Sequence, residues 1–122
     1  MASAFPVSKS LITGEAGAIE VAAHVSDVRM PLAIAVVAHP HPLFGGSMDN
    51  KVATTLARAM FDAGAATYRF NFRGVGKTEG VHDDGRGEAA DLLTVVESAR
   101  AAYPGLPLWL SGFSFGAAVT LA

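Results

Sequence analysis

A serine placed between two glycines, directly after a short apolar run, most restricts how this 122-residue chain can fold. Leu108–Leu110 has the composition of a buried strand, and small apolar residues follow the motif Gly112-Phe113-Ser114-Phe115-Gly116. This pattern predicts a strand, a sharp turn and a helix, with the serine at the apex of the turn. A turn this tight needs small residues on both sides, and it would expose the Ser114 hydroxyl beyond the end of a sheet.

By itself the motif is common, and an ordinary strand-to-helix turn with a capping serine would show the same residues. The preceding apolar run and the small residues that follow favour a nucleophile elbow, in which Ser114 attacks a carbonyl carbon. Such a nucleophile requires an oxyanion hole, because negative charge develops on the carbonyl oxygen. The backbone N–H of Phe115 is the expected first donor.

The second oxyanion donor is expected from the loop that follows an apolar run at residues 32–38. Pro40 and Pro42 have no N–H group and are excluded. The N–H of His41 is therefore the nearest candidate, and that of Leu43 is the next one along the chain.

The same loop supports a different hypothesis, because His39 and His41 have the spacing of a metal-binding pair at the end of a strand. Asp49 or His82 would have to add a further ligand. Since no third ligand stands at a dependable spacing, a metal-dependent hydrolase is the less favoured alternative. Histidines that hydrogen-bond within the loop are the ordinary interpretation.

Gly74-Val75-Gly76-Lys77-Thr78 resembles the end of a phosphate-binding loop. That motif requires a glycine five positions before Gly76, where this chain has Asn71. It also requires a helix to begin at the lysine and threonine, whereas Gly80 follows almost at once. We therefore reject a nucleotide-binding interpretation of this segment.

The rest of the chain alternates between strand and helix patterns, which predicts a single α/β domain over residues 1–122. Its expected architecture is a mostly parallel sheet with helices on both faces, and the chemistry of such sheets gathers at the carboxyl ends of the strands. The expected strands are 11–13, 18–25, 32–38, 66–72 and 106–110, and the expected helices are 52–63 and 88–102.

Side-chain patterns add four expectations about these elements. A face of the first helix is predicted to be buried, with the residues Val52, Leu56, Met60 and Ala63. Ser47 or Asp49 is expected to cap that helix. His24 falls on the more polar face of its strand. Arg73 is expected to form a structural salt bridge with one of the residues Asp83, Asp84 and Glu88.

Composition narrows the class of protein. A net charge of −2, with no run of like charges, argues against a nucleic-acid partner. The longest apolar stretch, 31–38, is too short to span a bilayer, and the first residues do not form a basic segment followed by an apolar one. The absence of cysteine excludes a disulfide scaffold and a thiolate metal site. We therefore expect a cytoplasmic protein that is not associated with a membrane.

Five segments together resemble the α/β-hydrolase superfamily, and in particular small bacterial predicted serine hydrolases that are similar to dienelactone hydrolases, esterases and peptidases. The segments are His39-Pro-His-Pro-Leu-Phe-Gly-Gly46, Met48-Asp-Asn-Lys-Val52, Arg69-Phe-Asn-Phe-Arg-Gly-Val-Gly76, Gly87-Glu88 with Asp91, and Gly112-Phe-Ser-Phe-Gly116. The resemblance implies hydrolysis of a small-molecule ester, or a related acyl substrate, through an acyl-enzyme and without a cofactor. Carried over, Ser114 matches the nucleophile, Phe115 one oxyanion donor and the loop 39–43 the other.

The chain departs from this superfamily after the motif. There the catalytic acid and histidine follow the nucleophile in the sequence, whereas the residues after Gly116 contain neither. We therefore interpret the chain as the N-terminal half of a hydrolase domain, without the catalytic Asp and His. A catalytically silent binding module on the same scaffold is the alternative. The strand that ends at Leu110 would expose a sheet edge that is open to self-association.

Overall fold

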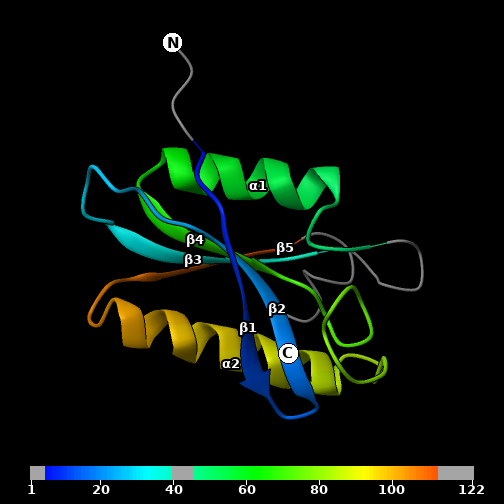
Figure 1. The fold of residues 1–122 in the computed structure, drawn as a ribbon. Coiled ribbons are helices and arrows are strands. Elements are labelled where there is room, and N and C mark those ends of the chain that lie inside the picture. The colour runs from blue at the N-terminus through cyan, green and yellow to red at the C-terminus, as the bar shows by residue number, and fades with distance from the viewer. Residues whose placement is uncertain (1–4, 40–45, 113–122) are drawn as a thin grey trace.

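A computed structural model gives the structure of the chain and describes residues 5–39 and 46–112. These residues form one five-stranded sheet and two long helices (Figure 1). The strands are β1 (Ser8–Gly14), β2 (Gly17–His24), β3 (Ala33–Ala38), β4 (Ala65–Phe70) and β5 (Leu108–Gly112). The helices are α1 (Lys51–Asp62) and α2 (Arg86–Ala102). Every strand and helix expected from the sequence within these ranges is present, with ends shifted by a few residues.

The sheet has the strand order β1-β2-β4-β3-β5. Strands β4, β3 and β5 run parallel to one another, whereas β1 pairs with β2 and β2 pairs with β4 in antiparallel fashion. Helix α1 covers one face of the sheet and α2 covers the other (Figure 1). The predicted α/β architecture with helices on both faces is therefore confirmed, and the antiparallel pairs add a mixed edge to a parallel centre.

The central strand β3 explains why its sequence is continuously apolar. Ile34, Val36 and Ala38 belong to the core cluster that contains the buried residues of α2. The intervening side chains face α1, where Val37 packs with Ala53 and Ala57. Alternate side chains of a strand point to opposite faces, so a strand that is covered on both sides shows no polar positions.

Helix α1 differs in two respects from its sequence expectation. Its N-cap is Asn50, whose side-chain Oδ1 accepts a hydrogen bond from the N–H of Val52 at 2.9 Å. Ser47 instead accepts from the N–H of Asp49 in the preceding turn, so neither expected residue caps the helix.

The buried stripe of α1 is Ala53, Ala57 and Phe61, one position away from the predicted face. Leu56 is only half-buried, and Ala63 is exposed. The alanines lie innermost because small side chains let the helix approach β3 closely, and a pattern based on large apolar residues does not detect this.

His24 is buried, with 1% of its surface exposed, and the expectation that it lies on a polar face was wrong. Its ring stacks on Phe5 with centroids 4.0 Å apart and planes within 5° of each other. Its Nδ1 lies 2.7 Å from the carbonyl oxygen of Pro6. The segment before β1 therefore covers the end of β2 and removes this histidine from solvent.

None of the helices in the described ranges is long and apolar enough to cross a membrane. The carboxyl ends of β3, β4 and β5 all point toward the same side of the sheet, on the right in Figure 1. The loop between β4 and α2 and the first turn of α1 lie on that side as well. This is the side on which the sequence places its candidate chemistry.

Candidate active site

The predicted site residues Ser114, Phe115 and His41 lie outside the described residues. The structure shows the strands that lead to them. Strands β3 and β5 are adjacent and parallel, and the last pair in their register joins Ala38 to Gly112. The segment that holds His41 and the segment that holds Ser114 therefore leave the sheet from paired positions on neighbouring strands.

His39 follows β3 directly and is completely buried. Its Nε2 accepts a hydrogen bond from the backbone N–H of Phe72 at 3.0 Å, and the two rings meet edge to face. This hydrogen bond occupies the Nε2 lone pair, so a metal ion could not bind His39 through that nitrogen. No group of three or more histidine, aspartate or glutamate side chains in the described ranges is arranged to hold a metal ion.

One hydrogen-bond partner of His39, Phe72, follows β4 and lies outside the loop that begins at His39. The buried Nε2 contact indicates that this side chain fixes the start of the loop. It gives no support to the metal-binding alternative.

A second contact holds the far end of the same loop. The N–H of Met48 donates to Oδ1 of Asn71 at 2.8 Å, and both residues are buried. Nδ2 of Asn71 donates in turn to the carboxylate of Glu20 on β2 at 2.9 Å. Asn71, which excluded a phosphate-binding loop in the sequence, thus has a structural role in the loop before α1.

Arg69 lies on β4 and is buried, with 6% of its surface exposed. Its Nη1 donates to the carbonyl oxygen of Met48, and its Nε donates to Nε2 of His24 at 2.9 Å. Nη1 also lies 3.2 Å from the carboxylate of Asp49, which is largely exposed. Sequence reasoning did not single out Arg69 as a site residue, although a cation at an inner position of a β-rich run is a signal that it could have used.

Arg73 forms its salt bridge with Asp91 of α2, not with any of the acids expected from the sequence. Glu15, at the turn between β1 and β2, lies within 3.5 Å of the same guanidinium. Glu88 is also buried, and its carboxylate accepts hydrogen bonds from the N–H groups of Asp83 and Gly85.

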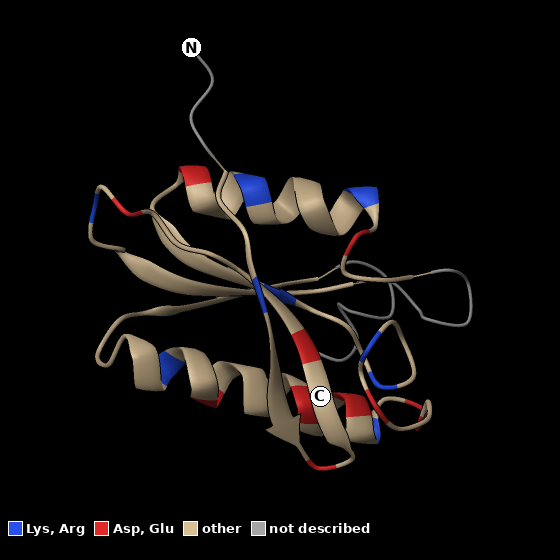
Figure 2. Ribbon diagram, in the orientation of Figure 1, with Lys and Arg blue, Asp and Glu red and all other residues tan. Residues whose placement is uncertain are grey.

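Charged residues gather around the β4–α2 loop and the start of α2 (Figure 2). Two acids at that end of α2, Asp91 and Glu88, are buried, and their carboxylates accept hydrogen bonds from residues of this loop. The motif Gly87-Glu88 with Asp91 is thus explained by the shape of this loop.

The segment that resembles a phosphate-binding loop is a closed turn. The N–H of Gly74 donates to the carbonyl of Thr78, whose hydroxyl accepts from the N–H of Glu20. A side chain at Gly76 would meet Asn71 and Glu20 within 2.6 Å. The turn is filled by protein side chains, which agrees with the rejection of nucleotide binding.

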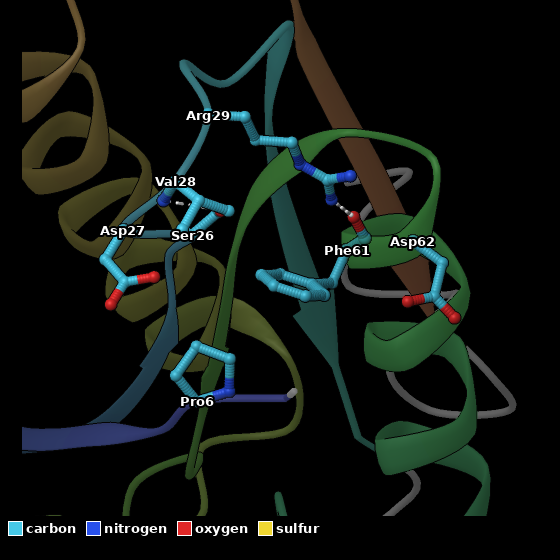
Figure 3. Close-up of a pocket in the computed structure, with 7 residues that line it drawn as sticks. All are labelled: Pro6, Ser26, Asp27, Val28, Arg29, Phe61 and Asp62. Carbon is cyan, nitrogen blue, oxygen red and sulfur yellow. Dashed lines mark hydrogen bonds between the residues drawn. The ribbon is translucent and has the colours of Figure 1, made fainter. Parts of the chain in front are cut away.

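A cavity of about 410 Å³ lies at the other end of the sheet (Figure 3). It is bounded by Pro6, by the β2–β3 loop and by the end of α1, where Arg29 donates to the carbonyl of Phe61. These segments lead into the amino ends of β3 and β4. The cavity is therefore separate from the carboxyl ends at which Ala38 and Gly112 are paired.

Comparison with known proteins agrees with this geometry. Residues 33–122 match the family described as serine aminopeptidase S33. An α/β serine hydrolase homologue from Coxiella burnetii has a similar solved structure, with a TM-score of 0.88, 43% identity and 93% of this chain covered. A lidless α/β serine hydrolase from Xanthomonas campestris also has a TM-score of 0.88, with 44% identity and 98% coverage. An uncharacterized protein of Rickettsia prowazekii (strain Madrid E) is 40% identical over 89 residues, which is 72% of this chain.

The chain spans 54% and 57% of the two solved relatives and 37% of the Rickettsia protein. The match to the first half of an α/β-hydrolase fold, expected from the sequence, is thereby confirmed. Since the family match covers well over half of the residues, the chain belongs to the serine aminopeptidase S33 family of α/β hydrolases.

Proposed function

We propose that this chain provides the nucleophile and the oxyanion hole of a serine hydrolase that cleaves carboxylic esters through an acyl-enzyme. The observation that carries the proposal is the parallel pairing of Ala38 with Gly112. Because of this pairing, the segments that contain His41 and Ser114 follow neighbouring strand ends. A nucleophile and its oxyanion donors must act on the same substrate carbonyl, so this adjacency supports the proposal.

In the proposed reaction the Ser114 hydroxyl adds to the carbonyl carbon of the ester and forms a tetrahedral intermediate. The N–H groups of Phe115 and His41 donate to its oxyanion. Each donor of this kind is typically worth about 3 kcal/mol of transition-state stabilisation. The alcohol then leaves, and water releases the acid from Ser114.

A general base must accept the proton of the hydroxyl, because a serine is a weak nucleophile without one. In relatives of this fold the catalytic acid and histidine follow the nucleophile in the sequence. We place both groups outside the residues of this chain. The intact mass of the protein purified from its source would show whether further residues follow Ala122.

A fluorophosphonate probe tests the nucleophile directly. We expect the protein purified from its source, with the catalytic acid and histidine present, to be labelled at Ser114 and its Ser114→Ala variant to be unlabelled. Any ester hydrolysis should fall by about 10⁶-fold in the same variant. Thr94→Ala is a suitable control, because the Thr94 hydroxyl binds only a carbonyl of its own helix, α2.

Labelling that persists in Ser114→Ala would contradict the proposal. A folded protein that contains the acid and histidine and is still not labelled would also contradict it, and would favour the catalytically silent binding module.

A further inference from the structure

The peptide groups of Met48 are held from both sides by the end of β4. Asn71 accepts the hydrogen bond of the Met48 N–H at 2.8 Å, and Arg69 donates to the Met48 carbonyl. All three residues are at least nine-tenths buried. Two polar side chains, one on β4 and one directly after it, thus fix a single residue at the end of the loop that precedes α1.

Both side chains are themselves oriented by β2. Asn71 donates to the carboxylate of Glu20, and the backbone N–H of Asn71 donates to the carbonyl of the same residue at 3.0 Å. Arg69 donates to His24. Since β2 pairs with β4 along this stretch, contacts with two neighbouring strands together determine the position of Met48.

The opposite end of the loop is attached to the same strand end. His39 accepts from the N–H of Phe72, which follows Asn71 in the chain. The loop between His39 and Met48 therefore starts and finishes on contacts made by residues 69–72. The loop between His39 and Met48 includes His41, the proposed second oxyanion donor.

Arg69 differs from an ordinary structural cation in the groups that accept its hydrogen bonds. Arg73 pairs with a buried carboxylate, whereas the carboxylate nearest to Arg69, that of Asp49, is 65% exposed. The short contacts of Arg69 are to a main-chain carbonyl and to a neutral ring nitrogen. Burying a guanidinium is costly, and an apolar residue would fill the space without that cost.

We propose that Arg69 and Asn71 are positioning residues that hold the Met48 peptide and thereby fix the oxyanion loop. The inference rests on the proposed function. Oxyanion donors stabilise the transition state only if they are aimed before the reaction begins, and a shift of about 1 Å can cost about 100-fold in rate.

The test measures how fast a fluorophosphonate reacts with Ser114, with the maximal rate constant and the half-saturating concentration determined separately. In Asn71→Ala the maximal rate constant should fall about 10-fold or more, while the half-saturating concentration changes less than about twofold. Hydrogen exchange at the Met48 amide should become faster in the same variant. Arg69→Met should act in the same direction, with Arg100→Met at an exposed position of α2 as the matched control.

Thr78→Ala is the matched control for Asn71→Ala. The buried Thr78 hydroxyl accepts from the N–H of Glu20 but makes no contact with Met48, so its loss should destabilise the same region. We expect Thr78→Ala to leave the probe kinetics unchanged and to speed Met48 exchange less than Asn71→Ala does.

A conservative rescue separates positioning from simple loss of stability. In the double variant Asn71→Asp/Glu20→Gln, the new carboxylate can accept from the Met48 N–H, and the new amide can donate back to it. The N–H of Lys77, which donates to the same Glu20 oxygen at an exposed position, can bind water instead. The double variant should recover at least half of the lost rate. Asn71→Asp alone should not, because it sets two carboxylates against each other.

Normal labelling of the unmodified protein with an unchanged maximal rate constant in Asn71→Ala would overturn this inference and leave the proposed function standing. An equal slowing in Thr78→Ala, or no recovery in the double variant, would overturn it in the same way. Absence of labelling in the unmodified protein would overturn the proposed function, and the positioning role with it.

Discussion

The guanidinium of Arg73 and the carboxylate of Asp91 form a buried, two-pronged ion pair between the end of β4 and helix α2. Nε lies 3.0 Å from Oδ2, and Nη2 lies 2.9 Å from Oδ1. This hydrogen bonding raises the pKa of Arg73 above its usual value. Both partners are satisfied by a parallel pair of bonds, which is the strongest arrangement that these two groups can form.

Asp91→Asn should therefore reduce the free energy of unfolding by about 3–5 kcal/mol, because it leaves the buried guanidinium with only the largely exposed Glu15 carboxylate as a counter-charge. Urea denaturation measures the change. Asp62→Asn is the matched control, since the exposed Asp62–Arg58 pair should contribute less than about 1 kcal/mol. If the two variants lose equal stability, the buried Arg73–Asp91 pair contributes no more to the stability of the protein than an exposed ion pair does.

Gly87→Ala should displace the Arg73 side chain. A Cβ built at Gly87 would come within 2.4 Å of the guanidinium carbon. Gly87 is the second residue of α2, where alanine gains less over glycine than the roughly 1 kcal/mol that it gains in a helix interior. The clash with Arg73 should therefore outweigh the higher helix propensity of alanine. We expect thermal unfolding at a lower temperature than in the unmodified protein.

The exposed substitution Glu97→Ala controls for a change of residue on α2 and should have little effect. In combination with Asp91→Asn, Gly87→Ala should cost less than it does alone, because the ion pair that it disturbs is already broken. A Gly87→Ala protein that unfolds at or above the normal temperature would contradict the close packing of Arg73 on this glycine.

Much of the fold could be predicted because apolar periodicity reports directly on which faces are covered. The continuous apolar run of β3 correctly indicated a strand between two helices, and Pro104-Gly105 correctly marked the end of α2. The inner face of α1 could not be found in this way. Its innermost residues are the alanines Ala53 and Ala57, whose burial depends on how closely the helix approaches the sheet.

The candidate site was only partly predictable, because the motifs indicate residue types but not their partners. Ser114, Phe115 and His41 remain predictions. The partner of Arg73 could not be chosen from nearby acids, since α2 turns Asp91 toward the sheet and leaves Asp84 in solvent. Met48 accepts a hydrogen bond from Arg69 and donates one to Asn71 across 21 and 23 residues of sequence, and no local pattern indicates such contacts.

Glu88→Gln should loosen the loop before α2. The Glu88 carboxylate accepts from the N–H groups of Asp83 and Gly85 at 2.9 and 3.1 Å, and an amide would set its own NH₂ group against one of them. A buried donor without an acceptor costs about 1–3 kcal/mol. Hydrogen exchange at one of these two amides should become at least about 5-fold faster.

Glu97→Gln, at an exposed position of the same helix, provides the control and should leave exchange at both amides unchanged. Equal exchange in the Glu88 and Glu97 variants would show that the Glu88 carboxylate does not hold this loop closed.

The stability of the protein should fall in mild acid because of His24. Burial lowers the pKa of His24 below 6.5, and the nearby positive charge of Arg69 acts in the same direction, while the hydrogen bond to Pro6 opposes both. Above pH 6.5 the histidine is neutral in the folded and unfolded states, and its contribution to stability is complete. As the pH falls below 6.5, the unfolded chain takes up the proton first, so stability is lost by at most about 1.4 kcal/mol per pH unit.

His24→Gln removes this titration and leaves every carboxylate in place. Its amide can still donate to the Pro6 carbonyl and accept from Arg69, the two contacts that the neutral ring makes. The difference in unfolding free energy between the two proteins, measured by urea denaturation at pH 7.5 and 5.5, should therefore shrink in acid. A constant difference across this range would mean that His24 accepts its proton equally readily in the folded and unfolded states, which its enclosure by Phe5 and Arg69 argues against.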